Sequence, residues 1–510
     1  MYRKELPRVT PESVGISSRM LLRMFKELEQ SVEMHGIMLA RHGKIFAETW
    51  WVPYSPQLPH ICHSLGKSYI GTAVGLAITD GYLSLNDRIV DIFADEIKQY
   101  GIHISDNMAR LTIEHQLMMA NGMSVHAASG ENLLKNYLST EVDHEPGHRF
   151  LYNTTGSCML GAAVQKLVGK SVRQYVTEGI FDKIGLANDE LEWMPFHGNG
   201  VHAAPGVATS TENNLRLGLL YLNYGEWEGK QLIDREWMKR ATTRRIRTDV
   251  INNESHITDN GAGYGYQLWI CPESETFKFS GGHGQDATMS RQNDLVIATH
   301  EAASDVTGVA SCNVLSKYLL MPKLSDKPLP EDPEALIELN NWLHSRAIKD
   351  RTCRSVPADI THWNGIYRLA EGGIHVNVEL RPLTDANVYT DFYDHDDVIA
   401  KELSVAVKQE SVELVLDDGT IRTTLHASLD GKLRTVPSVG AIPVYRQTIS
   451  TAYVSEEGDL IVETKFLQTC FWTKLTIHRI EGGIVVIARK ERLHEDQPYF
   501  YLTGKYTKVI

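Results

Sequence analysis

The sequence predicts an α/β (α+β) domain followed by an all-β domain, and three observations support this prediction. Strand-like patterns at residues 36–51 and 264–303 enclose a mostly helical stretch that begins at Ser64. A proline-rich connector follows at residues 322–358, and strand-like runs fill residues 359–510. Because strands lie at both ends of the helical stretch, we expect residues 1–321 to form one domain whose sheet uses both ends.

Within residues 1–321, three kinds of local pattern justify the elements. The stretch GIMLARHGKIFAETWW alternates apolar and polar residues around His42-Gly43, which predicts a β-hairpin. In TSTENNLRLGLLYLNYG, Thr209 and Glu212 predict a capping box at the start of a helix, which Gly225 ends. The runs YGYQLWI, TFKFSGG and DLVIATHEA then predict strands.

The connector and the C-terminal part are defined by prolines and by turn dipeptides. Four prolines occur within PKLSDKPLPEDP, and the last of them, Pro333, suits the first turn of a helix. Beyond it, runs such as GIYRL, SVELVLDD and GIVVIARK alternate as strands do, and Asp418-Gly419 and Asp430-Gly431 are typical turns. Many short strands at close spacing predict a closed barrel or a sandwich over residues 359–510.

Composition excludes several classes of function. The 510 residues carry a formal net charge of -13, which argues against nucleic acid or an anionic membrane as a partner. No stretch has the roughly 18 uncharged apolar residues of a membrane span, and the N-terminus lacks a signal-peptide pattern. The six cysteines are scattered without CxxC spacing. We therefore expect neither disulfides nor a zinc ribbon, and a cytoplasmic location.

The stretch HSLGKSYIGTAVGLAITDG carries the first candidate for chemistry. Ser64 and Lys67 are three positions apart, so on a helix their side chains lie on the same face. A serine hydroxyl becomes a good nucleophile when a base takes its proton, and a lysine in its neutral form is such a base. Burial favours the neutral form, and no charged residue follows Lys67 before Asp80. Gly66, Gly71 and Gly75 would let other backbone approach this helix closely.

Further segments, in order along residues 10–320, make the chain similar to the penicillin-recognising serine hydrolases. This family includes class C β-lactamases, D-alanyl-D-alanine carboxypeptidases, family VIII-type esterases and amidases like 6-aminohexanoate-dimer hydrolase. The SxxK pattern at Ser64 resembles its first motif. EPGHRFLYNTTGSCMLG resembles its second, with Tyr152 at the tyrosine, and FKFSGGHGQDATMS resembles a glycine-rich form of its third.

The resemblance implies a β-lactamase/transpeptidase-like domain, with an antiparallel sheet flanked by helices and a helical subdomain. It also implies that Ser64, Lys67 and Tyr152 are catalytic, acting through an acyl-enzyme without cofactor or metal. Tyr152 would pass a proton to the leaving group. The oxyanion would lie between the Ser64 N–H and one near Gly284 or Gln285. The predicted substrate- and oxyanion-binding residues are Gly282, His283, Gly284, Gln285 and Thr154.

Two departures from the family's pattern bear on the substrate. The second motif reads Tyr152-Asn153-Thr154, so a threonine replaces the asparagine that would bind an acylamide group. The third motif has no lysine to bind a substrate carboxylate, and the nearest arginine in sequence is Arg291. Both changes favour neutral esters or amides over penicillins or peptide C-termini.

Competing motifs are weaker. His144 and His148 have proline and glycine between them and lack the HExxH order of a zinc site. GAGYGYQ is followed by no helix, so it is not a dinucleotide fingerprint, and Cys62 replaces the glycine that a lipase-type elbow needs. Asp286 and His63 are candidates for supporting groups around the site or for purely structural roles.

Three classes of function remain open. The first is a serine esterase or amidase on small ester or amide substrates. The second is a D-amino-acid-specific peptidase or carboxypeptidase, or a β-lactamase, with a short peptide or lactam as substrate. The third is a non-catalytic ligand-binding scaffold on the same fold. The C-terminal strands resemble a lipocalin-like barrel, a module that could bind a ligand, cover the site or mediate a homodimer.

Overall fold

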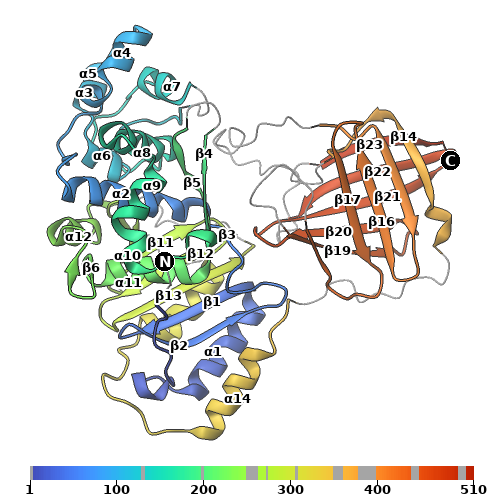
Figure 1. Ribbon diagram of the computed structural model, residues 1–510, viewed down its shortest axis with the longest axis horizontal. Coiled ribbons are helices and arrows are strands. Elements are labelled where there is room, and N and C mark those ends of the chain that lie inside the picture. The colour runs from blue at the N-terminus through green and yellow to red at the C-terminus, as the bar shows by residue number, and fades with distance from the viewer. Residues whose placement is uncertain are drawn as a thin grey trace. The chain divides into compact units, whose positions relative to one another are not determined.

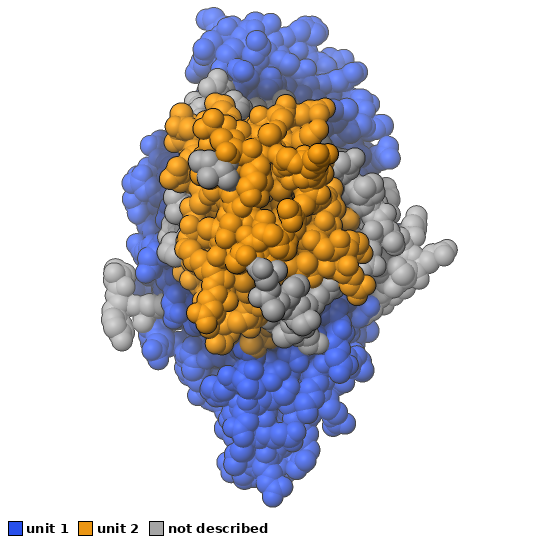
Figure 2. All heavy atoms as spheres, turned by 90° about the vertical axis from the view of Figure 1, so that its right-hand side faces the viewer, with its two compact units in different colours: residues 1–51, 55–346, 386–392 blue, residues 52–54, 347–385, 393–510 orange. Residues whose placement is uncertain are grey.

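The computed structural model describes residues 4–127, 132–196, 200–248, 262–271, 274–304, 308–348, 360–376, 398–437, 447–491 and 501–509. Contacts divide the chain into two compact units, which Figure 2 shows in different colours. The first contains residues 1–51 and 55–346, and the second contains residues 52–54, 347–385 and 393–510. Residues 322–346, which we predicted to belong to a connector, are therefore part of the first unit.

The first unit is built on an antiparallel sheet, which confirms the predicted fold class. Its strand order is β2-β1-β13-β12-β11-β10-β9-β8, so the N-terminal hairpin pairs directly with a strand from residue 295 onward. The strands are β1 (Glu33–Arg41), β2 (Lys44–Trp50), β8 (Ile246–Arg247), β9 (Gly263–Tyr264), β10 (Trp269–Cys271), β11 (Thr276–Gly281), β12 (Gln285–Ser290) and β13 (Leu295–Ala302). Smaller pairings join β3 (His60–Ile61), β4 (Leu191–Pro195) and β5 (His202–Thr209), and β6 (Glu226–Trp227) with β7 (Lys230–Gln231).

Helices cover both faces of this sheet (Figure 1). On one side lie α1 (Ser18–Ser31), α13 (Val309–Leu315) and α14 (Pro333–His344), and on the other lie α2 (Gly66–Thr79) and α11 (Thr211–Leu222). The remaining helices, mostly in the helical subdomain, are α3 (Ile89–Ile92), α4 (Ala94–Tyr100), α5 (Asp106–Arg110), α6 (Ile113–Leu117), α7 (Leu133–Ser139), α8 (Thr154–Val168), α9 (Val172–Val176), α10 (Asp182–Ile184) and α12 (Arg235–Ala241).

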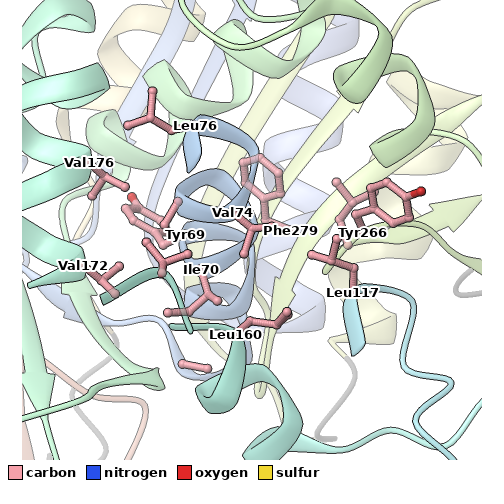
Figure 3. Close-up of a cluster of buried hydrophobic side chains, with 14 of the residues drawn as sticks. Tyr69, Ile70, Val74, Leu76, Leu117, Leu160, Val172, Val176, Tyr266 and Phe279 are labelled. Atoms are coloured by element: carbon pink, nitrogen blue, oxygen red, sulfur yellow. The ribbon is translucent and has the colours of Figure 1, made fainter. Parts of the chain in front are cut away.

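Helix α2 is the centre of the hydrophobic core. Twelve of its fourteen residues are buried, and Figure 3 shows its side chains beside those of α8, α9 and β11. The predicted close approach of other backbone is confirmed at two of its glycines. A Cβ on Gly66 would lie 2.1 Å from the Ala204 carbonyl, and one on Gly71 would lie 3.2 Å from the Tyr266 carbonyl. At Gly75 the close neighbour is a side chain, the Trp237 ring at 2.8 Å, and not backbone. This packing fixes the helix that carries Lys67.

The N-terminal hairpin and the predicted helices α11 and α14 are found in the structure. His42 and Gly43 have φ of 52° and 69°, as a tight hairpin turn requires, and α14 starts at Pro333. The capping box at Thr209 is wrong. The N-cap of α11 is Ser210, whose hydroxyl accepts a hydrogen bond from the Asn213 N–H, because the preceding residue is still paired in β5.

The second unit is an antiparallel barrel-like sheet, as predicted for the C-terminal domain. Its order is β17-β16-β15-β14-β23-β22-β21-β20-β19-β18, and a short parallel pairing joins β17, at one end, to β19, the strand next to the other end. The strands are β14 (Gly365–Gly372), β15 (Glu402–Val407), β16 (Ser411–Asp417), β17 (Arg422–Ser428), β18 (Thr435–Pro437), β19 (Gln447–Val454), β20 (Leu460–Phe466), β21 (Trp472–Ile480), β22 (Gly483–Glu491) and β23 (Tyr501–Lys508).

Candidate active site

The turn that leads into α2 brings the predicted nucleophile and base together. A short 3₁₀ turn, His63–Leu65, runs directly into the helix, so Ser64 and Lys67 are separated by about one helical turn. The Lys67 Nζ donates a hydrogen bond of 2.8 Å to the Ser64 Oγ. Lys67 is 1% exposed, whereas Ser64 is only half-buried. A buried amine in contact with a reachable hydroxyl is an arrangement that can activate that hydroxyl.

The residue before the nucleophile has an unusual backbone conformation. His63 has φ of 48°, in the left-handed region that residues other than glycine rarely adopt. Such conformations are costly and are found where the surrounding structure enforces them, often at functional sites. Here the chain passes from β3, which pairs with β5, into α2, and both elements are fixed by the core.

Tyr152 reaches the same site from the segment before α8. Asn153 caps this helix, with its Oδ1 accepting from the Gly156 N–H at 2.8 Å. The Lys67 Nζ lies over the Tyr152 ring, 4.7 Å from its centroid. Of the residues that the structure describes, neither Ser64 nor Lys67 exchanges a hydrogen bond with the Tyr152 hydroxyl. The three predicted catalytic residues are thus brought together, with Lys67 in contact with both others.

Thr154 is the first residue of α8 and is buried. Within the described part of the chain, no hydrogen bond joins it to Ser64 or Lys67. Its predicted role in substrate binding stays a prediction.

The third-motif segment forms the hairpin between β11 and β12. Gly281 ends β11 against the turn of the nucleophile, since a Cβ there would lie 1.9 Å from the Cys62 carbonyl and 3.0 Å from the Leu65 nitrogen. A Cβ on Gly282 would have its nearest neighbour, the His63 ring, at 3.9 Å. The structure therefore places both glycines beside the nucleophile turn.

Among the next three residues of the hairpin, His283 also meets the nucleophile turn, because its ring lies edge-on to the His63 ring at a centroid separation of 6.0 Å. The His283 Nδ1 lies 3.1 Å from the Ala303 carbonyl, and a Cβ on Gly284 would collide with the Glu301 carboxylate at 1.8 Å. The Gln285 amide donates to the Glu301 and His283 carbonyls at 2.6 and 3.0 Å. Their side-chain contacts therefore hold the hairpin together. Sequence reasoning passed over Gly281, although the paired glycines of FSGG were the available signal.

The lysine of this strand lies on the other face of the sheet. Successive residues of a strand point to opposite faces, and Phe279 is in the core beside α2 (Figure 3), so Lys278 points away from it. Its Nζ donates to Asp286 at 2.8 Å and to the Cys312 sulfur at 3.4 Å. Burial is the largest single effect and lowers the pKa of Lys278, but the Asp286 carboxylate, together with Cys312 and Cys271, raises that pKa overall. Asp286 thus has a structural partner.

Arg291 is also engaged elsewhere. Its guanidinium lies 4.1 Å from the Tyr224 ring centroid and 4.4 Å from that of Phe277, and it donates to the Thr242 hydroxyl at 2.8 Å. The two cations closest in sequence to the third motif, Lys278 and Arg291, are therefore held by other partners.

Sequence reasoning missed a histidine and a group of aromatic residues around Tyr152. The His126 Nε2 lies 2.9 Å from the Tyr152 carbonyl, and burial, with a smaller effect from the charge of Lys67, lowers the pKa of His126. Trp269 stacks on Tyr152 with a centroid separation of 5.9 Å. No local motif marks these residues, because they come from a loop and a strand that meet only in the fold.

No group of three histidine, cysteine or acidic residues among the described residues is placed to hold a metal ion. Likewise, none of the described helices is both long and apolar enough to cross a membrane.

Comparison with known proteins assigns the family. The family model described as Beta-lactamase matches residues 23–302, more than half of the chain. The chain therefore belongs to the beta-lactamase family, a class of serine hydrolases. Among curated proteins it is similar to 6-aminohexanoate-dimer hydrolase of Paenarthrobacter ureafaciens, at 20% identity over 312 residues, which cover 56% of this chain and 78% of that protein.

Two solved structures are also similar. One is the octameric penicillin-binding protein homologue from Pyrococcus abyssi, at 14% identity and a TM-score of 0.45, covering 96% of this chain and 99% of that one. The other is a family VIII carboxylesterase, at 14% identity and a TM-score of 0.47, covering 62% of this chain and all of that one (100%).

Proposed function

We propose that the protein is a serine hydrolase that forms an acyl-enzyme on Ser64 with small ester or amide substrates. The observation that carries this proposal is the 2.8 Å contact between the buried Lys67 Nζ and the half-buried Ser64 Oγ. Membership of a serine hydrolase family supports it. The relative named 6-aminohexanoate-dimer hydrolase makes amides a reasonable part of the substrate range.

In the proposed acylation step, Lys67 accepts the proton of the Ser64 hydroxyl. The Ser64 Oγ forms a bond to the substrate carbonyl carbon, whose oxygen becomes negatively charged. The Tyr152 hydroxyl delivers a proton to the leaving alcohol or amine as its bond to that carbon breaks, and Lys67 passes the proton from Ser64 to the Tyr152 oxygen, which restores both Lys67 and Tyr152. Water then attacks the acyl-enzyme, which releases the carboxylic acid and restores Ser64.

The oxyanion of this reaction needs hydrogen-bond donors beside Ser64. We propose the backbone N–H of Ser64 and that of Gly282. Gly282 was among the predicted residues, and the contact of its neighbour Gly281 with Cys62 and Leu65 supports this choice. The sequence suggested that the second N–H donor lies near Gly284 or Gln285. Gly284 instead lies against the Glu301 carboxylate, so we favour the N–H of Gly282 as this donor.

The substrate at the reacting end is proposed to be neutral. Lys278 and Arg291 are held by Asp286 and by aromatic rings, respectively, so neither supports binding of a substrate carboxylate. We also propose that the enzyme works in a reducing compartment such as the cytoplasm. Cys62, Cys158 and Cys312 are free thiols, which is compatible with that location.

The test is covalent labelling followed by a substrate panel. A fluorophosphonate should label the full-length protein at one site, and peptide mapping should place the label on Ser64. The Ser64→Ala variant, with an unchanged melting temperature, should take up no label and should hydrolyse no p-nitrophenyl ester or anilide. Labelling or turnover that persists in Ser64→Ala would overturn the proposal. A protein that folds but neither labels nor turns over any substrate would favour the scaffold alternative.

A further inference from the structure

Tyr152 lies in a small aromatic cluster that is separate from the main hydrophobic core. The cluster contains Phe150, Tyr152, Tyr264 and Trp269, together with Met119. Trp269 stacks on Tyr152 with an angle of 14° between the rings, and it meets Tyr264 edge-on at 5.1 Å. Phe150 contacts Trp269 at 5.8 Å. The Tyr152 ring is therefore held by three aromatic neighbours as well as by the Lys67 Nζ.

The position of Trp269 in its strand indicates that its packing serves this cluster. Its neighbours Leu268 and Ile270 are buried in the main core, whereas Trp269 is half-buried and points to the other face of β10. Tyr264 is its direct partner across the β9–β10 pair, so the two rings lie on the same face. Trp269 therefore contacts Phe150, Tyr152 and Tyr264 on this face, where its partner across the β10–β11 pair is Lys278.

Acyl transfer is sensitive to small displacements of the groups that move protons. Tyr152 lies just before α8, and among the described residues the hydrogen bond to its backbone carbonyl comes from the His126 ring. Of the described hydrogen bonds, none holds its hydroxyl to Ser64 or Lys67. The ring's orientation therefore depends on stacking, and the largest parallel contact is with Trp269.

We propose that Trp269 is a positioning residue for acyl transfer, because it holds the Tyr152 ring where the hydroxyl can serve Ser64 and Lys67. This inference rests on the proposed function. Trp269 acts through Tyr152 and takes no part in bond making. Its loss should therefore lower kcat while leaving KM nearly unchanged, and a second aromatic ring at position 269 should restore most of the rate.

The experiment compares Trp269→Leu and Trp269→Phe with Trp227→Leu. Trp227 is a matched control, since it is also a half-buried tryptophan on a short strand of the first unit, and it lies in β6 outside the cluster. We expect Trp269→Leu to lower both kcat and the rate of fluorophosphonate labelling about 10- to 30-fold. Trp269→Phe should lower these rates less than about 3-fold, and Trp227→Leu should hardly change them. An unchanged rate in Trp269→Leu would overturn the inference.

A double-mutant cycle with Tyr152→Leu separates positioning from general support of the fold. If Trp269 acts through Tyr152, then Trp269→Leu should slow labelling by less than about 2-fold in the Tyr152→Leu background. An equal loss in both backgrounds would show a merely structural role and would also overturn the inference. The same series measures whether the wild type is labelled and whether this labelling is lost in Ser64→Ala. Absence of Ser64-dependent labelling would contradict the proposed function, whereas the Trp269 variants test only this inference.

Discussion

At the scale of single residues, the Ser64–Lys67 contact could be predicted from the sequence, because helical geometry alone places positions three apart on one face. The contact between Lys67 and the face of the Tyr152 ring could not. It depends on where the segment before α8 meets α2, and no spacing in the sequence records that meeting. His126 and Trp269 were missed for the same reason.

The contact of Lys67 with both Ser64 and Tyr152 leads to a prediction about coupling. Lys67→Ala and Tyr152→Phe should each lower kcat by at least about 100-fold, and the double variant should be little worse than the poorer single variant, because the residues act as a unit. Steady-state kinetics with a p-nitrophenyl ester checks this. Near-wild-type kcat in either single variant, or losses that multiply, would contradict the mechanism.

A buried histidine gives a prediction about acid stability. Burial, with a smaller effect from the charge of His35, lowers the pKa of His300 to about 3. Its Nε2 lies 3.2 Å from the Asn214 Nδ2, which donates to it, so protonation at that atom would break this bond. The unfolded chain takes up the proton near pH 6.5, so this contribution to stability is complete above that pH and is lost as the pH falls.

We expect urea unfolding of the wild type to lose about 2 kcal/mol more between pH 7.5 and pH 5 than His300→Gln loses over the same range. The exposed His103 supplies the control, and His103→Gln should follow the wild-type slope. The prediction fails if His300→Gln and the wild type show the same pH dependence.

At the scale of elements, sequence patterns located the N-terminal hairpin, α2, α11 and α14, since each of these has a strong local signal. They did not fix the register of the third motif. The segment GGHG offers several glycines that could lie beside the nucleophile turn. Gly281 does so, because it packs against the Cys62 carbonyl, whereas Gly284 packs against the Glu301 side chain. Both neighbours come from distant parts of the chain.

This register leads to a prediction with a matched pair of variants. In Gly281→Ala the new Cβ would lie 1.9 Å from the Cys62 carbonyl, so the nucleophile turn or the hairpin must move. We expect a loss of about 1–3 kcal/mol in stability and at least about 100-fold slower labelling of Ser64.

Gly282→Ala is the comparison, because its Cβ has nothing nearer than 3.9 Å and the backbone N–H is kept. It should fold and label within about 5-fold of the wild type. Similar behaviour of the two variants in thermal melts and labelling kinetics would show that Gly281 does not define this side of the site.

At the scale of the whole molecule, the two-part architecture could be predicted from the change in sequence pattern near residue 322. The division of the structure differs in detail. Residues 52–54 belong to the second unit, where Val52 pairs with Ala347. A single bridge across almost 300 positions leaves no periodic signal in the sequence, so this detail is visible only in the fold.

The distribution of charge over the molecule predicts the preferred acyl donor. The chain has a net charge of -13, and the cations nearest to the third motif are engaged elsewhere. An anionic donor therefore lacks a charge-assisted hydrogen bond of about 1.5–3 kcal/mol, which corresponds to roughly 10- to 150-fold in kcat/KM.

Matched donors with a free and a methylated carboxylate test this, and neutral donors should be hydrolysed faster than benzylpenicillin or D-Ala-D-Ala peptides. A preference for the free acid would contradict the prediction and would favour the peptidase or lactamase alternative.

The packing of β11 also bears on how this enzyme could change in evolution. A lysine of β11 could bind a substrate carboxylate only from the strand face that is turned toward the nucleophile turn. The positions on that face are Phe277, Phe279 and Gly281. The first two are buried aromatic residues, and the third has no room even for a methyl group. No single substitution on this strand therefore offers a cation to a substrate carboxylate. A descendant that hydrolyses anionic substrates would take its cation from outside β11, and Gly282 in the following hairpin, where a Cβ would have no neighbour nearer than 3.9 Å, has room for a side chain.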